Sequence, residues 1–122
     1  MKNICILPWI SIDRNRTRST DKVSLTPCCL YESNKAHSII DDYWNDPETV
    51  SLRKSLIAGE RPEGGRLCWE NEDKGLRSLR QSVNEGRLDT YKERFKSTTL
   101  VDKPVQVKYT AGIECNLACR MC

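Results

Sequence analysis

Three cysteines near the end of the chain have the type and spacing that suit a metal centre. Cys115, Cys119 and Cys122 form a C-x3-C-x2-C pattern. Thiolates are soft ligands that select zinc, copper(I) or iron-sulfur clusters. A structural zinc site takes four ligands, and a ferredoxin-type cubane takes one cysteine for each iron. Three thiolates on one loop would therefore leave one iron of a [4Fe-4S] cluster open, or form part of a zinc knuckle that a fourth residue completes.

The other four cysteines are Cys5, Cys28, Cys29 and Cys68. Seven cysteines would indicate disulfides in a secreted protein, but the apolar run that follows residue 3 is short and contains Pro8, so it does not resemble a secretory signal. We therefore expect the reducing cytoplasm, where clustered cysteines more often bind metal. No apolar stretch approaches the roughly 18 residues that would span a membrane, and no membrane partner is expected.

The composition is that of an ordinary globular chain. Of its 122 residues, 38% are hydrophobic and 30% are charged, and the length predicts one domain with a small core. The formal net charge of +3 is too small to predict nucleic-acid binding, which calls for a concentrated basic face.

Two short strands, 9–13 and 23–26, are predicted ahead of the first helices. If they pair as a hairpin, the numbers of facing residues should sum to roughly 35. This register places Cys5 close to Cys28 and Cys29, and a slip of one residue would change which of the two adjacent cysteines faces inward. The segment between the strands carries basic residues that are more typical of a solvated hairpin tip than of a phosphate site: Arg14, Arg16, Arg18 and Lys22.

Helices are predicted within 38–95. The stretch 38–44 opens on a Ser-x-x-Asp capping pattern. The next helix should begin with Asp46 as its cap and Pro47 in its first turn, and should end at Gly59. Its expected apolar face consists of Val50, Leu56 and Ile57.

Cys68 follows a turn-rich stretch and opens a further helical segment. The apolar residues expected on one face of that segment are Leu76, Leu79 and Val83, and those of a shorter amphipathic segment are Leu88, Tyr91 and Phe95. Residues 97–104 are predicted to be a linker, since Pro104 disfavours helix at the preceding residue. The alternation of apolar and polar residues over 105–109 predicts a strand.

The pattern of Cys115, Cys119 and Cys122, with the hydrophobic Met121 before the third cysteine, resembles the signature of the radical S-adenosylmethionine superfamily. The resemblance implies a [4Fe-4S] cluster on the three cysteines, with Met121 as a cofactor-binding residue. In that family the open iron chelates S-adenosylmethionine, and an electron from the cluster cleaves it to a 5'-deoxyadenosyl radical that abstracts a substrate hydrogen. The strand 105–109 would be the first barrel strand, leading into the cluster loop 115–122.

The order of the preceding pieces resembles the twitch-domain, SPASM-like branch of this superfamily, in which a small cysteine-containing module precedes the barrel. The matching residues are Cys5 with Pro8-Trp9, Pro27-Cys28-Cys29, Tyr43-Trp44-Asn45, Leu52-Arg53-Lys54 to Gly59, Pro62-Glu63-Gly64, Cys68-Trp69-Glu70 and Ser78-Leu79-Arg80. The resemblance covers nearly the whole chain. It implies that module 1–96, a hairpin over about 9–26 plus helices in 38–95, holds an auxiliary iron-sulfur cluster on Cys5, Cys28 and Cys68.

The chain departs from this pattern at Gly65, where the family usually has the first cysteine of a C-x2-C pair with Cys68. Cys29 is the candidate fourth ligand, although neighbouring side chains on an extended segment point to opposite faces. Two other interpretations stay open. Cys5, Cys28, Cys29 and Cys68 could form a zinc site, or the cysteines of this module could be small buried side chains without a metal.

A second departure is that the chain stops at Cys122, whereas a complete eight-stranded barrel runs to about 250 residues. We therefore expect an α+β chain that is the N-terminal portion of a radical enzyme, with 105–109 left as an unpaired edge strand and no turnover by this chain alone. The complete protein would use S-adenosylmethionine and an electron donor, with a peptide or protein as substrate by analogy. The alternatives are a zinc-binding structural or interaction module and, less favoured, a nucleic-acid-binding domain that uses the basic hairpin.

Overall fold

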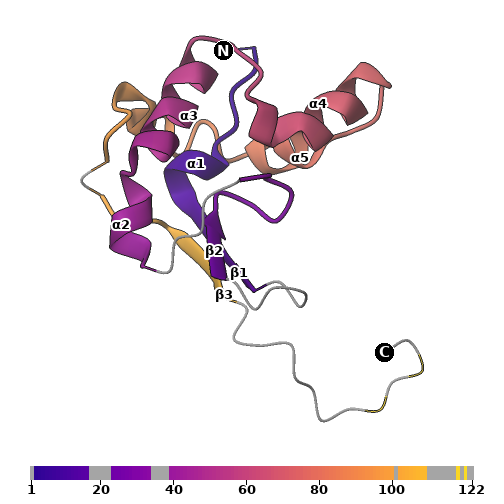
Figure 1. Cartoon of the computed structure of the whole chain (residues 1–122). Coiled ribbons are helices and arrows are strands. Elements are labelled where there is room, and N and C mark those ends of the chain that lie inside the picture. Colours follow the sequence, from indigo (N-terminus) through magenta and orange to yellow (C-terminus); the bar gives the residue numbers. More distant parts are fainter. Residues whose placement is uncertain are drawn as a thin grey trace.

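The computed structural model describes residues 2–16, 23–33, 39–100, 102–109, 118 and 120. Within these ranges the chain combines a three-stranded sheet with several short helices (Figure 1), which confirms the predicted α+β class. The elements are α1 (Leu7–Ile10), β1 (Ser11–Arg16), β2 (Val23–Thr26), α2 (Ile40–Trp44), α3 (Pro47–Ile57), η1 (Glu63–Gly65), α4 (Arg66–Asp73), α5 (Leu79–Asn84), η2 (Lys92–Lys96) and β3 (Gln106–Tyr109), where η denotes a 3-10 helix. None of the helices in the described ranges is long and apolar enough to cross a membrane.

The sheet has the strand order β2-β1-β3. β2 pairs with β1 antiparallel, whereas β3 pairs with β1 parallel, with Val107 beside Ile12. The expectation of an unpaired strand near the end of the chain is therefore wrong. A parallel pair needs a long crossover, and the helices from α2 to η2 supply it. The backbone N–H of Val105 continues the contact by donating to the carbonyl oxygen of Ile10 at 2.8 Å.

The predicted hairpin exists and its second strand has the predicted limits, but the limits of its first strand and the pairing register differ. β1 begins at Ser11, because Leu7–Ile10 form one helical turn with Pro8 in its first positions. Asp13 faces Thr26, four positions beyond the partner that the predicted register gave it. The strand also extends through Arg14 to Arg16, so these two residues belong to the sheet rather than to the hairpin tip.

Helix α3 begins as predicted. The side chain of Asp46 accepts a hydrogen bond from the backbone N–H of Glu48 at 2.8 Å, and Pro47 is the first helical residue. The helix ends in a Schellman motif, in which Gly59 has φ +80° and the N–H of Glu60 donates to the carbonyl of Ser55 at 2.9 Å. The residues on its buried face are Thr49, Leu52, Arg53 and Leu56. The predicted apolar face was wrong in including Ile57, which is exposed.

Two other helical predictions differ from the structure in part. α2 starts at Ile40 with Ile39 as its cap residue and no side-chain cap, while the predicted cap, Ser38, lies outside the described residues. The helix expected after Cys68 is divided into α4 and α5, because Gly75 takes φ +75° and Ser78 starts a new helix with a capping box. Leu76 lies exposed between the two helices.

The core is built around Trp9, which is completely buried at the end of α1. Phe95 packs edge-on against the Trp9 ring with 5.0 Å between the two centroids. Trp9 Nε1 donates to the carbonyl of Ser97 at 3.0 Å. The described residues of the segment 97–104, which was predicted as a linker, pack against the core. Leu100 is buried, and Trp44 Nε1 donates to the carbonyl of Asp102 at 2.8 Å.

A completely buried arginine on α3, Arg53, connects three parts of the chain. Its guanidinium and Nε donate to the carbonyls of Pro8 at 2.9 Å, Trp44 at 2.8 Å and Thr98 at 2.9 Å, and to Asn45 Oδ1 at 3.1 Å. Burial lowers the pKa of Arg53 to about 10. These bonds join α1, α2 and the segment after η2 around one side chain.

Candidate metal centre

Three of the predicted ligands gather around one cavity. Cys5, Cys28 and Cys68 all line a cavity of about 40 Å³, and their thiols are free. Apolar side chains form most of the remaining wall, including Leu52, Leu56 and Trp69. Cys29, the candidate fourth ligand, is exposed and does not line this cavity, as the opposite directions of adjacent side chains would suggest.

Each thiol reaches the cavity from a different element. Cys5 lies in the segment before α1, Cys28 follows β2, and Cys68 lies in the first turn of α4. The turn at Cys28 is stabilised through its carbonyl oxygen, which accepts from Thr26 Oγ1 at 2.8 Å and from the N–H of Tyr31 at 3.3 Å. Three segments that are far apart in sequence therefore deliver one sulfur each.

Cys5 lies near Cys28 for a reason other than the predicted hairpin register. The observed register would carry an extended chain away from Cys28, but residues 7–10 are helical. A helix advances 1.5 Å per residue, against about 3.3 Å in a strand. The helical turn of α1 thus shortens the path from β1 back to Cys5.

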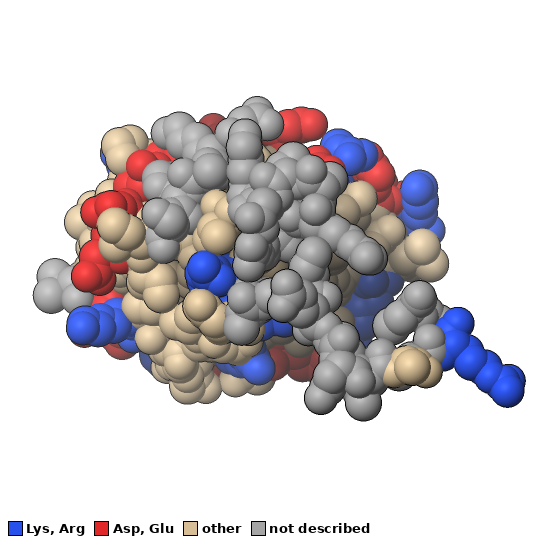
Figure 2. Space-filling model, turned by 60° about the horizontal axis from the view of Figure 1, so that its bottom comes forward, with Lys and Arg blue, Asp and Glu red and all other residues tan. Residues whose placement is uncertain are grey.

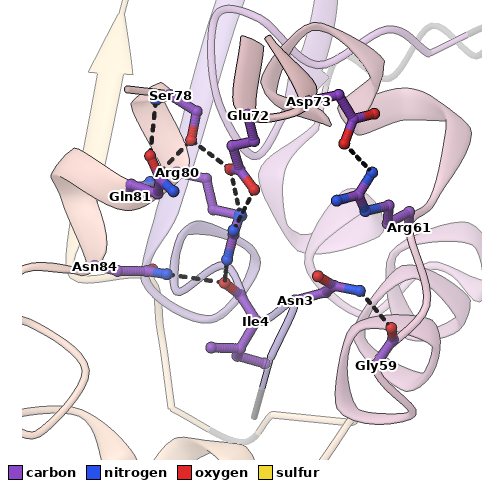
Figure 3. A network of polar contacts seen from close by, with 10 residues as sticks. All are labelled: Asn3, Ile4, Gly59, Arg61, Glu72, Asp73, Ser78, Arg80, Gln81 and Asn84. Carbon is purple, nitrogen blue, oxygen red and sulfur yellow. Dashed lines mark hydrogen bonds and ion pairs between the residues drawn. The ribbon is translucent and has the colours of Figure 1, made fainter. Parts of the chain in front are cut away.

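Side chains from α4 and α5 hold the segment that contains Cys5 (Figure 3). Arg80 and Asn84 both donate to the carbonyl oxygen of Ile4 at 2.8 Å, and Asn84 Oδ1 accepts from the N–H of Ile6 at 3.0 Å. Arg80 also makes a bidentate ion pair with Glu72, with 2.9 Å from Nε to Oε1 and 2.6 Å from Nη2 to Oε2. The sequence did not predict this network. Its signals in the sequence were the Ser-x-x-Gln capping pattern that begins α5 and the presence of Ser78-Leu79-Arg80 among the residues that carry the resemblance.

Burial opposes ionisation of the thiols. It raises the pKa of Cys5 to about 12 and that of Cys28 to about 11, although backbone N–H groups partly offset the effect. In contrast, hydrogen bonds from Arg80 and Ser78 outweigh the burial of Glu72 and hold the pKa of its carboxyl below the ordinary value. A metal that binds here would have to displace the thiol protons, because metal ligation requires thiolates.

The donor set suits a thiophilic group, with three thiols and largely apolar walls. The cavity is larger than the roughly 10–15 Å³ that one water needs. The sulfurs are nevertheless not preassembled, since no three cysteine, histidine or acidic side chains of the described ranges lie close enough together to hold one ion. Binding would therefore require the thiols to move inward.

Gly65 lines the same cavity as the three cysteines. It stands one helical turn before Cys68, at the position where the resemblance expects a further cysteine. A β-carbon at Gly65 would lie 3.0 Å from Trp69 Nε1, and that ring is anchored by a hydrogen bond to the carbonyl of Pro62 at 2.9 Å. A side chain at position 65 would thus become part of the cavity wall and would be mildly crowded by the Trp69 ring.

The predicted C-terminal cluster residues, Cys115, Cys119, Met121 and Cys122, lie outside the described residues. No family model, curated protein or solved structure matches the chain. The iron-sulfur and S-adenosylmethionine assignments therefore stay predictions that rest on the sequence.

On the face drawn in Figure 2, acidic and basic side chains of the described residues both occur around the grey region. Within the described part of the basic hairpin, Arg14 lies over the ring of Tyr109 at 4.4 Å. This contact joins β1 to β3 and gives Arg14 a role in the sheet.

Proposed function

We propose that this chain is the N-terminal portion of a radical S-adenosylmethionine enzyme, with Cys115, Cys119 and Cys122 as ligands of the radical-generating [4Fe-4S] cluster. The cluster, when bound, would supply the electron that cleaves S-adenosylmethionine. The observation that carries the proposal is that Cys5, Cys28, Cys68 and Gly65 line one cavity. The resemblance assigns these four positions to one auxiliary site, and they come from three separate parts of the chain.

In this proposal the first module supplies a second iron-sulfur site. Cys5, Cys28 and Cys68 would be its ligands, and the apolar wall with Trp69 would exclude water from it. Burial and hydrogen bonding to the sulfurs tune the potential of such a centre. As the resemblance implies, β3 would be the first strand of the barrel. S-adenosylmethionine, an electron donor and a peptide or protein substrate in the cytoplasm are the partners proposed for the complete enzyme.

A zinc-binding structural module is the second candidate. The cavity of about 40 Å³ accommodates a single ion more readily than an eight-atom cubane. Three thiolates plus a fourth ligand would complete a tetrahedral zinc site. In this case the metal would contribute folding free energy and no chemistry.

Metal analysis of cysteine variants tests the proposal. The chain would be purified without oxygen, and iron, acid-labile sulfide and zinc would be measured per polypeptide in the wild type, Cys119→Ala and Cys68→Ala. Cys29→Ala is the matched control, because Cys29 is exposed and lies outside the cavity. We expect iron and sulfide to fall together in both site variants and to stay unchanged in the control. Unchanged iron in Cys119→Ala would refute the C-terminal cluster site.

A further inference from the structure

Asn84 forms both hydrogen bonds of a strand-like pair with the backbone on either side of Cys5. Its Nδ2 donates to the Ile4 carbonyl at 2.8 Å, and its Oδ1 accepts from the Ile6 N–H at 3.0 Å. Asn84 is itself buried, so water does not compete for these bonds. The two contacts fix the peptide groups that flank Cys5, and with them the direction in which its side chain leaves the backbone.

Arg80 adds a charge to the same arrangement. It is buried and lines the thiol cavity, whereas its partner Glu72 does not line the cavity. The positive end of this ion pair therefore faces the thiols. The guanidinium also lies over the ring of Trp69 at 5.0 Å, and its bond to the Ile4 carbonyl joins it to the Asn84 contacts (Figure 3).

A buried ion pair is a costly way to fill a core, and apolar residues of similar size often stabilise a fold as well or better. The orientation of this pair gives it a further use. Thiolates bound to a metal leave a centre with excess negative charge, and a cation on the cavity wall stabilises such a centre where the effective dielectric constant is low. Residues just outside the ligands commonly contribute a factor of about 10 to 100 in metal affinity.

We propose that Asn84 is the positioning residue for Cys5, and that Arg80, oriented by Glu72, is the charge-balancing residue of a metal-thiolate centre on Cys5, Cys28 and Cys68. This inference rests on the proposed function only for the presence of a metal. It does not depend on whether the metal is an iron-sulfur cluster or zinc.

Cobalt(II) alone serves as the probe for the charge-balancing role. The reduced, metal-free full-length chain would be titrated with cobalt(II) and then alkylated, and mass spectrometry would report the protection of each cysteine separately, including those of the C-terminal motif. The test variant combines Arg80→Met with Glu72→Met, so that no unpaired charge stays buried. The matched control combines Arg77→Met with Glu85→Met, an exposed ion pair with the same sequence separation.

The cobalt(II) concentration that half-protects Cys5, Cys28 and Cys68 should rise about tenfold in the test variant and less than about twofold in the control. Arg80→Lys, which keeps the charge, should recover part of the loss. An unchanged midpoint in the test variant would overturn the role of Arg80. No protection of these cysteines in the wild type would overturn the charge-balancing role, whereas the iron and sulfide content of the chain tests the iron-sulfur centre separately.

The positioning role of Asn84 is tested separately, by the rate at which Cys5 is alkylated in the metal-free chain. Asn84→Leu removes both bonds, and Asn84→Asp keeps the acceptor for the Ile6 N–H but loses the donor to Ile4. We expect Cys5 to be alkylated severalfold faster in either variant, with the rate at Cys29 unchanged. Circular dichroism would identify a variant that fails to fold, in which case the other variant is used. An unchanged rate at Cys5 in a folded variant would overturn the positioning role whatever the metal experiment shows.

Discussion

Replacing Arg53 with methionine should destabilise the fold far more than replacing an exposed arginine. Methionine approximates the length of the aliphatic stem but removes all four hydrogen bonds of the guanidinium and Nε. Two of the acceptors, the carbonyls of Pro8 and Trp44, are in buried bonds. The other two bonds are partly buried, so water can replace them at lower cost.

The expected loss follows from the two buried carbonyls. A buried polar group left without a partner costs about 1–3 kcal/mol, so the pair predicts a loss of about 2–6 kcal/mol in the free energy of unfolding. Domains of this kind are stable by about 5–15 kcal/mol. The substitution should therefore remove a large part of the total stability. Arg53→Lys should fall between the wild type and Arg53→Met, because an ammonium group has three donors but not the fork geometry.

Urea unfolding followed by fluorescence of the three tryptophans measures this difference. Arg77→Met is the matched control, since Arg77 is exposed and its bonds are to Ser82 and to Glu85. Exposed ion pairs contribute about 0–1 kcal/mol, so the control should lose no more than that. A loss below about 1 kcal/mol in Arg53→Met would refute the assignment of Arg53 as the side chain that joins the three segments.

Three further predictions address the site and the local structure. Gly65→Cys should bind more metal than Gly65→Ala, since both crowd the same tryptophan ring and only cysteine adds a ligand; equal metal content would contradict a missing ligand at that position. Asp46→Ala should cost about 1 kcal/mol through loss of the helix cap, measured by urea unfolding against exposed Asp89→Ala; equal stabilities would contradict it. Burial raises the pKa of Cys5 to about 12 and only the thiolate reacts, so alkylation of metal-free Cys5 should be slow at pH 8 and accelerate as the pH rises toward that value. Exposed Cys29 should react first, and the reverse order would contradict the burial of Cys5.

Features set by neighbouring residues could be predicted from the sequence. The start of α3 is an example, because the cap at Asp46 and the proline after it act within one turn. The second hairpin strand was also predicted with its observed limits, Val23–Thr26. In both cases the chemistry that decides the structure lies within a few residues.

Features that depend on distant partners could not be predicted in this way. The first hairpin strand starts later than predicted because α1 takes up Trp9 and Ile10, and β3 pairs with β1 across almost the whole chain. Arg53 and Arg80 follow no apolar pattern, since the burial of Arg53 is offset by the distant carbonyl of Pro8 and that of Arg80 by the carboxylate of Glu72 on the preceding helix.

At the candidate site, too, some residues could be predicted from the sequence and others could not. Cys5, Cys28 and Cys68 were selected by resemblance to a motif, and the structure places all three on one cavity. The register argument that placed Cys5 near Cys28 was wrong. The opposite directions of adjacent side chains indicated that only one of Cys28 and Cys29 would face inward, and the structure shows that Cys29 is the exposed one. Asn84 could not be selected at all, because its bonds with Ile4 and Ile6 appear only when α5 packs against the first segment.

The most direct test of the metal-centre account is the content of iron, acid-labile sulfide and zinc in the wild-type chain purified without oxygen. We expect about four irons with matching sulfide if one cubane forms, and about eight if both sites fill. Zinc without sulfide would contradict the radical-enzyme assignment in favour of a structural module. A chain with neither metal after reconstitution with iron and sulfide would contradict both.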